Sequence, residues 1–125
     1  MSRMRYALLV TAFMLFQAMP CQAAALKACP DSGTVRYEQL AVTSGVAVPI
    51  SPHSYLSTPM ARGALINVET ASVRFRMDGT APTTSTGQLL ASGDWVVFSN
   101  PNNVSRAQFI ASSTSATVTV QPLCD

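Results

Sequence analysis

The segment ALINVETASVRFRM, residues 64–77, contains two short runs with the two-residue period of a β-strand. In Ala64–Glu69 every second residue is apolar. In Ser72–Met77 valine, phenylalanine and methionine alternate with Arg74 and Arg76. Successive side chains of a strand point to opposite faces. The segment therefore predicts two half-buried strands, the second with Arg74 and Arg76 on one solvent face.

Other strand-like runs lie on both sides of this segment, separated by Gly, Pro, Asn and Ser. They are Val35–Leu40 with a continuation through Thr43, Val46–Ile50, Trp95–Ser99, Ala107–Ala111 and Ala116–Val120. The stretches Ser51–Gly63 and Asn100–Asn103 are rich in proline or asparagine and predict loops. No segment after residue 26 has a sustained helical period. The pattern indicates an all-β domain, either a β-sandwich or a barrel.

The N-terminal residues differ in composition from the rest. Arg3 and Arg5 precede the apolar run ALLVTAFMLF at residues 7–16, and small residues follow. This order is typical of a secretory signal peptide, and the run is about half the ~20 apolar residues that a membrane-spanning helix needs. We expect residues 1–25 to be a signal peptide and residues 26–125 to form one exported domain, either periplasmic or secreted.

The charge balance argues against two classes of partner. The formal net charge is +2, from 8 Lys and Arg against 6 Asp and Glu. Arg3 and Arg5 account for this excess, so the expected domain is near neutral. A nucleic-acid-binding surface needs clustered basic residues, and a membrane-surface helix needs a basic amphipathic segment. The sequence therefore predicts neither partner for the domain.

Two cysteines, Cys29 and Cys124, remain near the two ends of the expected domain, because Cys21 falls within the signal peptide. A pair of cysteines in an exported protein predicts a disulfide. Closing a loop of this length would stabilise the fold by roughly 4 to 5 kcal/mol. Two cysteines and one histidine, His53, are too few for a structural zinc site.

No catalytic, cofactor or metal site is expected. His53 lies in a proline-rich stretch, and the sequence lacks the Gly-x-Ser-x-Gly elbow that would position a serine nucleophile. The acidic residues are scattered, and three of them have explanations as turn residues. Phosphate-loop, zincin and EF-hand motifs are absent from the sequence. The sequence thus predicts a protein without enzymatic activity.

The segment DGTAPT, residues 78–83, predicts a rigid turn after the second strand of the opening segment. Asp78 can accept backbone N–H groups in an Asx turn that includes Thr80, and Gly79 can adopt positive φ. Pro82 stiffens the connection. Because turn chemistry explains each residue type, we interpret Asp78, Gly79, Thr80 and Pro82 as structural rather than as ligand contacts.

Several of these motifs resemble a known family. RFRMDGTAPT at residues 74–83, the L-x-x-G-D turn at 90–94 and the closing ATVTV at 116–120 are similar to small bacteriophage virion accessory proteins. The DGT-x-PT piece alone also resembles the C-terminal β-sandwich domain of chitobiase-like enzymes. Both resemblances imply an immunoglobulin-like β-sandwich without catalysis of its own. A signal peptide and a disulfide depart from the pattern of virion proteins, which are assembled in the cytoplasm.

The leading functional hypothesis is a structural or interaction protein similar to a decoration, head–tail or tail component. Its partner would be a protein surface of a virion or a cell, and a homo-oligomer is compatible with this role. Arg74 and Arg76 form the candidate interaction face, since arginine is favoured at protein interfaces. The simpler alternative is that the two arginines pair with Glu69 on a neighbouring strand.

A secreted carbohydrate-binding module is the rival hypothesis. Trp95, Tyr37 and Tyr55 are the aromatic side chains that would stack on sugars. A tryptophan inside a strand is more often part of the core, so the sequence predicts a core position for Trp95.

Overall fold

The computed structural model describes residues 25–29, 37–56 and 60–125, without the side chains of His53 and Tyr55. Apart from Ala25, the predicted signal peptide lies outside these residues, as does the start of the first predicted strand at residues 35 and 36. Among the helices that are described, none is both long and apolar enough to cross a membrane.

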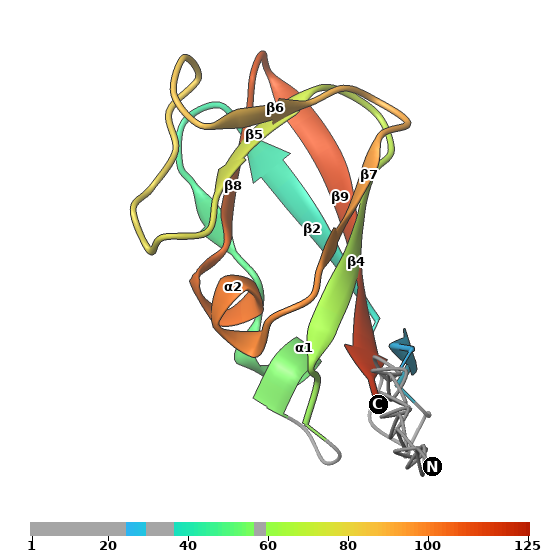
Figure 1. The fold of residues 1–125 in the computed structure, drawn as a ribbon. Coiled ribbons are helices and arrows are strands. Elements are labelled where there is room, and N and C mark those ends of the chain that lie inside the picture. The colour runs from blue at the N-terminus through green and yellow to red at the C-terminus, as the bar shows by residue number, and fades with distance from the viewer. Residues whose placement is uncertain (1–24, 30–36, 57–59) are drawn as a thin grey trace, which may run out of the picture.

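Two antiparallel sheets face each other, so the protein is an all-β sandwich, as the sequence predicts (Figure 1). Sheet A has five strands: β1 (Lys27–Ala28), β2 (Glu38–Thr43), β4 (Gly63–Val68), β7 (Trp95–Phe98) and β9 (Ser115–Cys124). Sheet B has four: β3 (Val48–Pro49), β5 (Val73–Arg76), β6 (Gln88–Leu90) and β8 (Gln108–Ala111). β9 pairs with β1, β2 and β4 and is thus the central strand of sheet A.

The core lies between the inner faces of the two sheets. The alternation predicted for β4 and β5 is confirmed, because Ile66 and Val73 are fully buried and Phe75 is nearly so. Phe75 and Phe109 of sheet B pack against Phe98 of sheet A, with ring centroids 5.5 Å and 6.4 Å from Phe98. Aromatic pairs at such separations add to the stabilisation from burial itself. The three rings therefore hold the two sheets together.

Two one-turn helices occupy stretches that the sequence predicts as loops. They are α1 (Pro52–Leu56) and α2 (Pro101–Arg106). The side chain of Asn100 caps α2 by accepting a hydrogen bond from the Asn102 backbone N–H at 2.8 Å, and Pro101 occupies the first turn. Such cap and proline placements favour a helix start, but a single turn is too short to show a hydrophobic period.

Strand boundaries differ from the prediction mainly at the sheet edges. β1 and β6 were not predicted, and β3 covers only two residues of the expected run Val46–Ile50. β6 has three residues, and its first two are exposed, so no alternation marks it in the sequence. β9 continues beyond Val120 to Cys124, where it pairs with β1.

Candidate functional site

The turn after β5 has the geometry that the sequence predicts. Asp78 Oδ1 accepts a hydrogen bond from the Thr80 backbone N–H at 3.0 Å, and Gly79 has φ +83°. Pro82 is buried, which anchors the middle of the connection from β5 to β6. The Gln108 side chain, on the neighbouring strand β8, donates to the Gly79 carbonyl at 3.2 Å. The turn is therefore tied to sheet B at both ends.

Arg76 and Asp78 form a two-point ion pair at the surface. Arg76 Nε donates to Asp78 Oδ1 at 3.2 Å, and Nη2 donates to Oδ2. This hydrogen bond is the largest influence that lowers the pKa of Asp78, to about 2, and the Thr80 N–H adds to it. The same pair raises the pKa of Arg76. Asp78 is thus ionised above a pH of about 2, and the ion pair holds there.

Arg74 bonds to the connection that follows its strand. Its Nε donates to the Thr84 carbonyl at 2.9 Å and its Nη1 to the Gly87 carbonyl at 3.0 Å. The guanidinium of half-buried Arg74 therefore binds the β5–β6 connection to β5. The alternative pairing with Glu69 is wrong, because Arg76 pairs with Asp78 and Glu69 accepts from Gln39 Nε2 at 3.1 Å.

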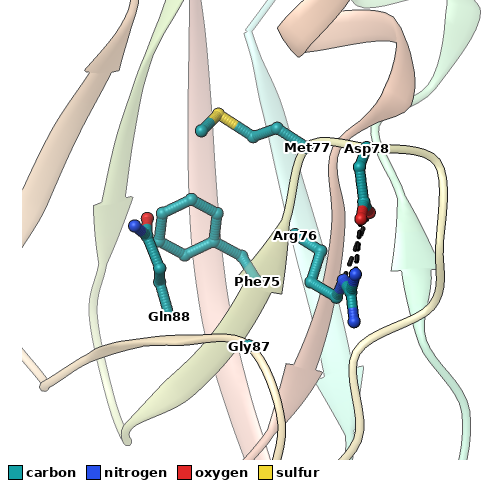
Figure 2. A pocket seen from close by; sticks show the side chains of 6 residues that line it. All are labelled: Phe75, Arg76, Met77, Asp78, Gly87 and Gln88. Carbon is teal, nitrogen blue, oxygen red and sulfur yellow. Dashed lines mark hydrogen bonds and ion pairs between the residues drawn. The ribbon is translucent and has the colours of Figure 1, made fainter.

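An open hollow of about 470 Å³ lies beside the Arg76–Asp78 pair. Figure 2 shows its lining: Phe75, Arg76, Met77, Asp78, Gly87 and Gln88. Phe75 and Met77 project to one side of β5, and Arg76 projects to the other side toward Asp78 (Figure 2). The hollow therefore combines apolar surface with one charged pair.

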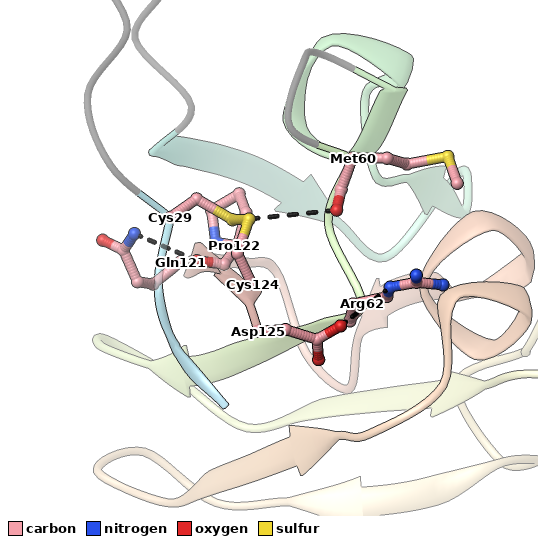
Figure 3. Close-up of a disulfide and its surroundings, with 7 residues drawn as sticks. All are labelled: Cys29, Met60, Arg62, Gln121, Pro122, Cys124 and Asp125. Atoms are coloured by element: carbon pink, nitrogen blue, oxygen red, sulfur yellow. Dashed lines mark hydrogen bonds and ion pairs between the residues drawn. A yellow bond between two sulfur atoms is a disulfide. The ribbon is translucent and has the colours of Figure 1, made fainter. Parts of the chain in front are cut away.

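The predicted disulfide between Cys29 and Cys124 is confirmed (Figure 3). The two Cα atoms lie 4.9 Å apart, and both residues are buried. Around the bond, the Cys29 N–H donates to the Pro122 carbonyl at 3.1 Å, and Arg62 pairs with Asp125 at 3.2 Å. The bond joins β9 to the segment that contains β1, and so links the two ends of the described chain.

The outer face of sheet A carries a second candidate surface. Outward side chains from β4, β7, β9 and the residue before β2 form what we call the platform: Tyr37, Leu65, Asn67, Trp95, Thr119 and Gln121. These six residues are uncharged. An open hollow of about 520 Å³ lies at its β7 end, lined by Leu65, Asn67, Gly93 and Trp95.

The core position predicted for Trp95 is wrong, since 67 % of this residue is exposed. β7 is an edge strand of sheet A, and Trp95 lies on its outer face, whereas Phe98 of the same strand is buried. The sequence also gave no indication of Asn67 and Gln121 as candidate binding residues. The alternation of β4 places Asn67 on the outer face, but only the strand order brings Trp95 beside it.

The described residues contain no group of three or more His, Cys, Asp or Glu side chains that could hold a metal ion. His53 lies in α1, and its side chain is outside the described part of the structure.

Comparisons with protein-family models, with curated proteins and with solved structures found no match. The assignment of the sandwich fold therefore rests on the structure of this chain.

Proposed function

We propose that the protein is a non-enzymatic structural or interaction protein of the kind that its RFR-x-DGT-x-PT pattern resembles, a phage virion accessory component. The observation that carries the proposal is that the residues of this pattern form one hydrogen-bonded unit on sheet B. Arg74, Arg76 and Asp78 all bond within the unit. Hydrogen bonds of this kind stabilise the fold. A stabilising role for these residues is what the resemblance to structural proteins implies.

The contact surface for the protein partner is the side of sheet B around Arg76. The Arg76–Asp78 pair is exposed there, beside a hollow that Gly87 and Gln88 also line. Leu89 of β6 is 54 % exposed and lies opposite Arg74 in the sheet register. Arginine, methionine and aromatic residues are enriched at protein interfaces, and the guanidinium keeps N–H donors beyond the two that Asp78 accepts.

The Cys29–Cys124 disulfide supports export as part of this proposal, because such bonds persist in oxidising compartments. A phage or prophage product that the host exports, or a bacterial surface protein with the same domain, fits both the resemblance and the disulfide. Cell fractionation of the native strain tests this part: the chain should be recovered from the periplasm, the medium or particles, and recovery from the cytoplasm alone would contradict it.

The test of the contact surface is incorporation into particles. Tagged chains are expressed in the strain that carries the gene, and particles are purified on density gradients. The variant Arg76→Ser with Leu89→Ser should retain the wild-type melting temperature but fall at least tenfold in incorporation. The matched control, Arg106→Ser with Leu56→Ser, changes an exposed arginine and an exposed leucine elsewhere and should incorporate normally.

Two results would contradict the proposal in different ways. Normal incorporation of the Arg76 and Leu89 variant would show that the contact surface is wrong. If the wild-type chain is absent from particles and from complexes with any surface protein, the functional class itself is wrong.

A further inference from the structure

We propose that the platform on the outer face of sheet A binds a neutral oligosaccharide. The platform lies on sheet A, whereas the Arg76 surface lies on sheet B. Whether the platform binds a sugar therefore does not affect the proposed protein contact. The argument depends on the placement of two aromatic residues, on the polar side chains between them, and on the absence of charge from the platform.

Trp95 and Tyr37 mark the two ends of the platform. Trp95 lies on the edge strand β7, 67 % exposed, and Tyr37 is 48 % exposed at the start of β2. Glu38 pairs with Val120, so the same register places Tyr37 next to Gln121. Three strand spacings of about 4.8 Å and an offset of two residues, about 3.3 Å each, along the strands then separate the two aromatic residues by roughly 16 Å. A short oligosaccharide chain spans such a distance, with a sugar ring on each aromatic face.

Between the two aromatic residues the platform holds Asn67, Gln121 and the nearly buried Thr119, together with Leu65. Asn67 is the register partner of both Trp95 and Thr119. In the described part of the chain, neither the side-chain amide of Asn67 nor the indole N–H of Trp95 makes a hydrogen bond. An amide both donates and accepts, as a sugar hydroxyl does. The two groups are thus free to bond a ligand that alternates C–H faces with hydroxyls.

This arrangement favours a sugar over a protein surface as the occupant. A protein interface has an apolar centre surrounded by a polar rim. Between Trp95 and Tyr37 the platform has the amides of Asn67 and Gln121 beside Leu65, so hydrogen-bonding groups share its centre with an apolar side chain. The carboxylate of Glu69, two residues beyond Asn67, accepts a hydrogen bond from Gln39 at 3.1 Å. An uncharged surface of amides and hydroxyls matches a neutral glycan.

Trp95 is the sole tryptophan of the chain, so its fluorescence reports directly on the platform. The exported protein is titrated with cellohexaose, chitohexaose and maltohexaose, and with glucose and N-acetylglucosamine as single rings. At least one hexasaccharide should cause a saturable change in emission with a shift to shorter wavelength. Its affinity should exceed that of its single ring at least tenfold, because only the longer chain reaches both aromatic residues.

Variants measured by calorimetry separate the two ends of the site. Trp95→Ala should abolish binding of the hexasaccharide. Tyr37→Ala should weaken the binding of the hexasaccharide at least tenfold and leave the affinity for the single ring unchanged. Leu89→Ser, on sheet B, should bind as the wild type does. Circular dichroism melts verify that each variant is folded, and Trp95→Phe, which keeps an aromatic face, should retain measurable binding if Trp95→Ala is unstable.

Three results would overturn the proposal. The first is an emission spectrum that none of the five sugars changes at millimolar concentration. The second is unchanged calorimetric binding by the Trp95→Ala variant. The third is loss of particle incorporation by the Trp95 and Tyr37 variants without any glycan binding by the wild type, which would make the platform a protein contact.

Discussion

Removal of the Cys29–Cys124 disulfide should cost the protein a large part of its stability. The bond joins residues 95 positions apart, and a loop of that length loses roughly 4 to 5 kcal/mol of chain entropy from the unfolded state. Domains of this size are stable by only about 5–15 kcal/mol in total. At about 4–8 °C for each kcal/mol, the melting temperature should fall by roughly 16 to 40 °C.

The assay compares the wild type with its disulfide formed and a Cys29→Ala and Cys124→Ala double variant by thermal and urea denaturation. Both cysteines are buried, so reductant added to the folded wild type would act slowly, and the double variant is the cleaner perturbation. Neighbouring Ala61 makes a small buried cluster with the two cysteines, and the alanines leave only a small void there. A fall of the melting temperature by less than about 5 °C would refute the entropic argument, because it corresponds to only about 1 kcal/mol.

Two further predictions concern the β5–β6 connection. Gly79→Ala should destabilise the fold by about 1 to 2 kcal/mol through left-handed strain alone, since a Cβ there meets nothing within 4 Å. Gly87→Ala should cost more in the same melts, because its φ is +114° and its Cβ would lie 2.9 Å from the Phe75 carbonyl oxygen; equal costs would contradict this. In an NMR pH titration, Arg76→Ser should raise the pKa of Asp78 from about 2 toward its usual value, whereas Arg106→Ser should not. Because the folded pKa of Asp78 is lowered, its stabilising contribution is complete above about pH 4, the usual range of an aspartate, and is lost as pH falls through about 2. A wild-type Asp78 that titrates near pH 4 would refute the pairing.

Local sequence signals predicted the elements whose structure depends on a few neighbouring residues. Alternation in β4 and β5 identified their buried faces, because each strand has one face in the core. Asp78 and Gly79 predicted the turn, since an Asx side chain and positive φ act within a few residues. The short helices and the edge strands β1 and β6 were missed because they are too short to show a period.

Alternation indicates which side chains share a face, but it does not indicate what covers that face. Arg74 and Trp95 both lie at outward positions of strands. Arg74 is hydrogen-bonded to a loop, whereas Trp95 remains exposed. The β5–β6 connection folds back so that the Thr84 and Gly87 carbonyls take the donors of Arg74, which the sequence predicts to be free. Trp95, predicted to be in the core, stays exposed because it lies on the outer face of the edge strand β7, whereas Phe98 on the inner face is buried. Both outcomes depend on strand order and on the path of a connecting loop, and these are set by the whole chain. Trp95, the residue that marks one end of the proposed platform, is therefore one that the local pattern assigned to the core.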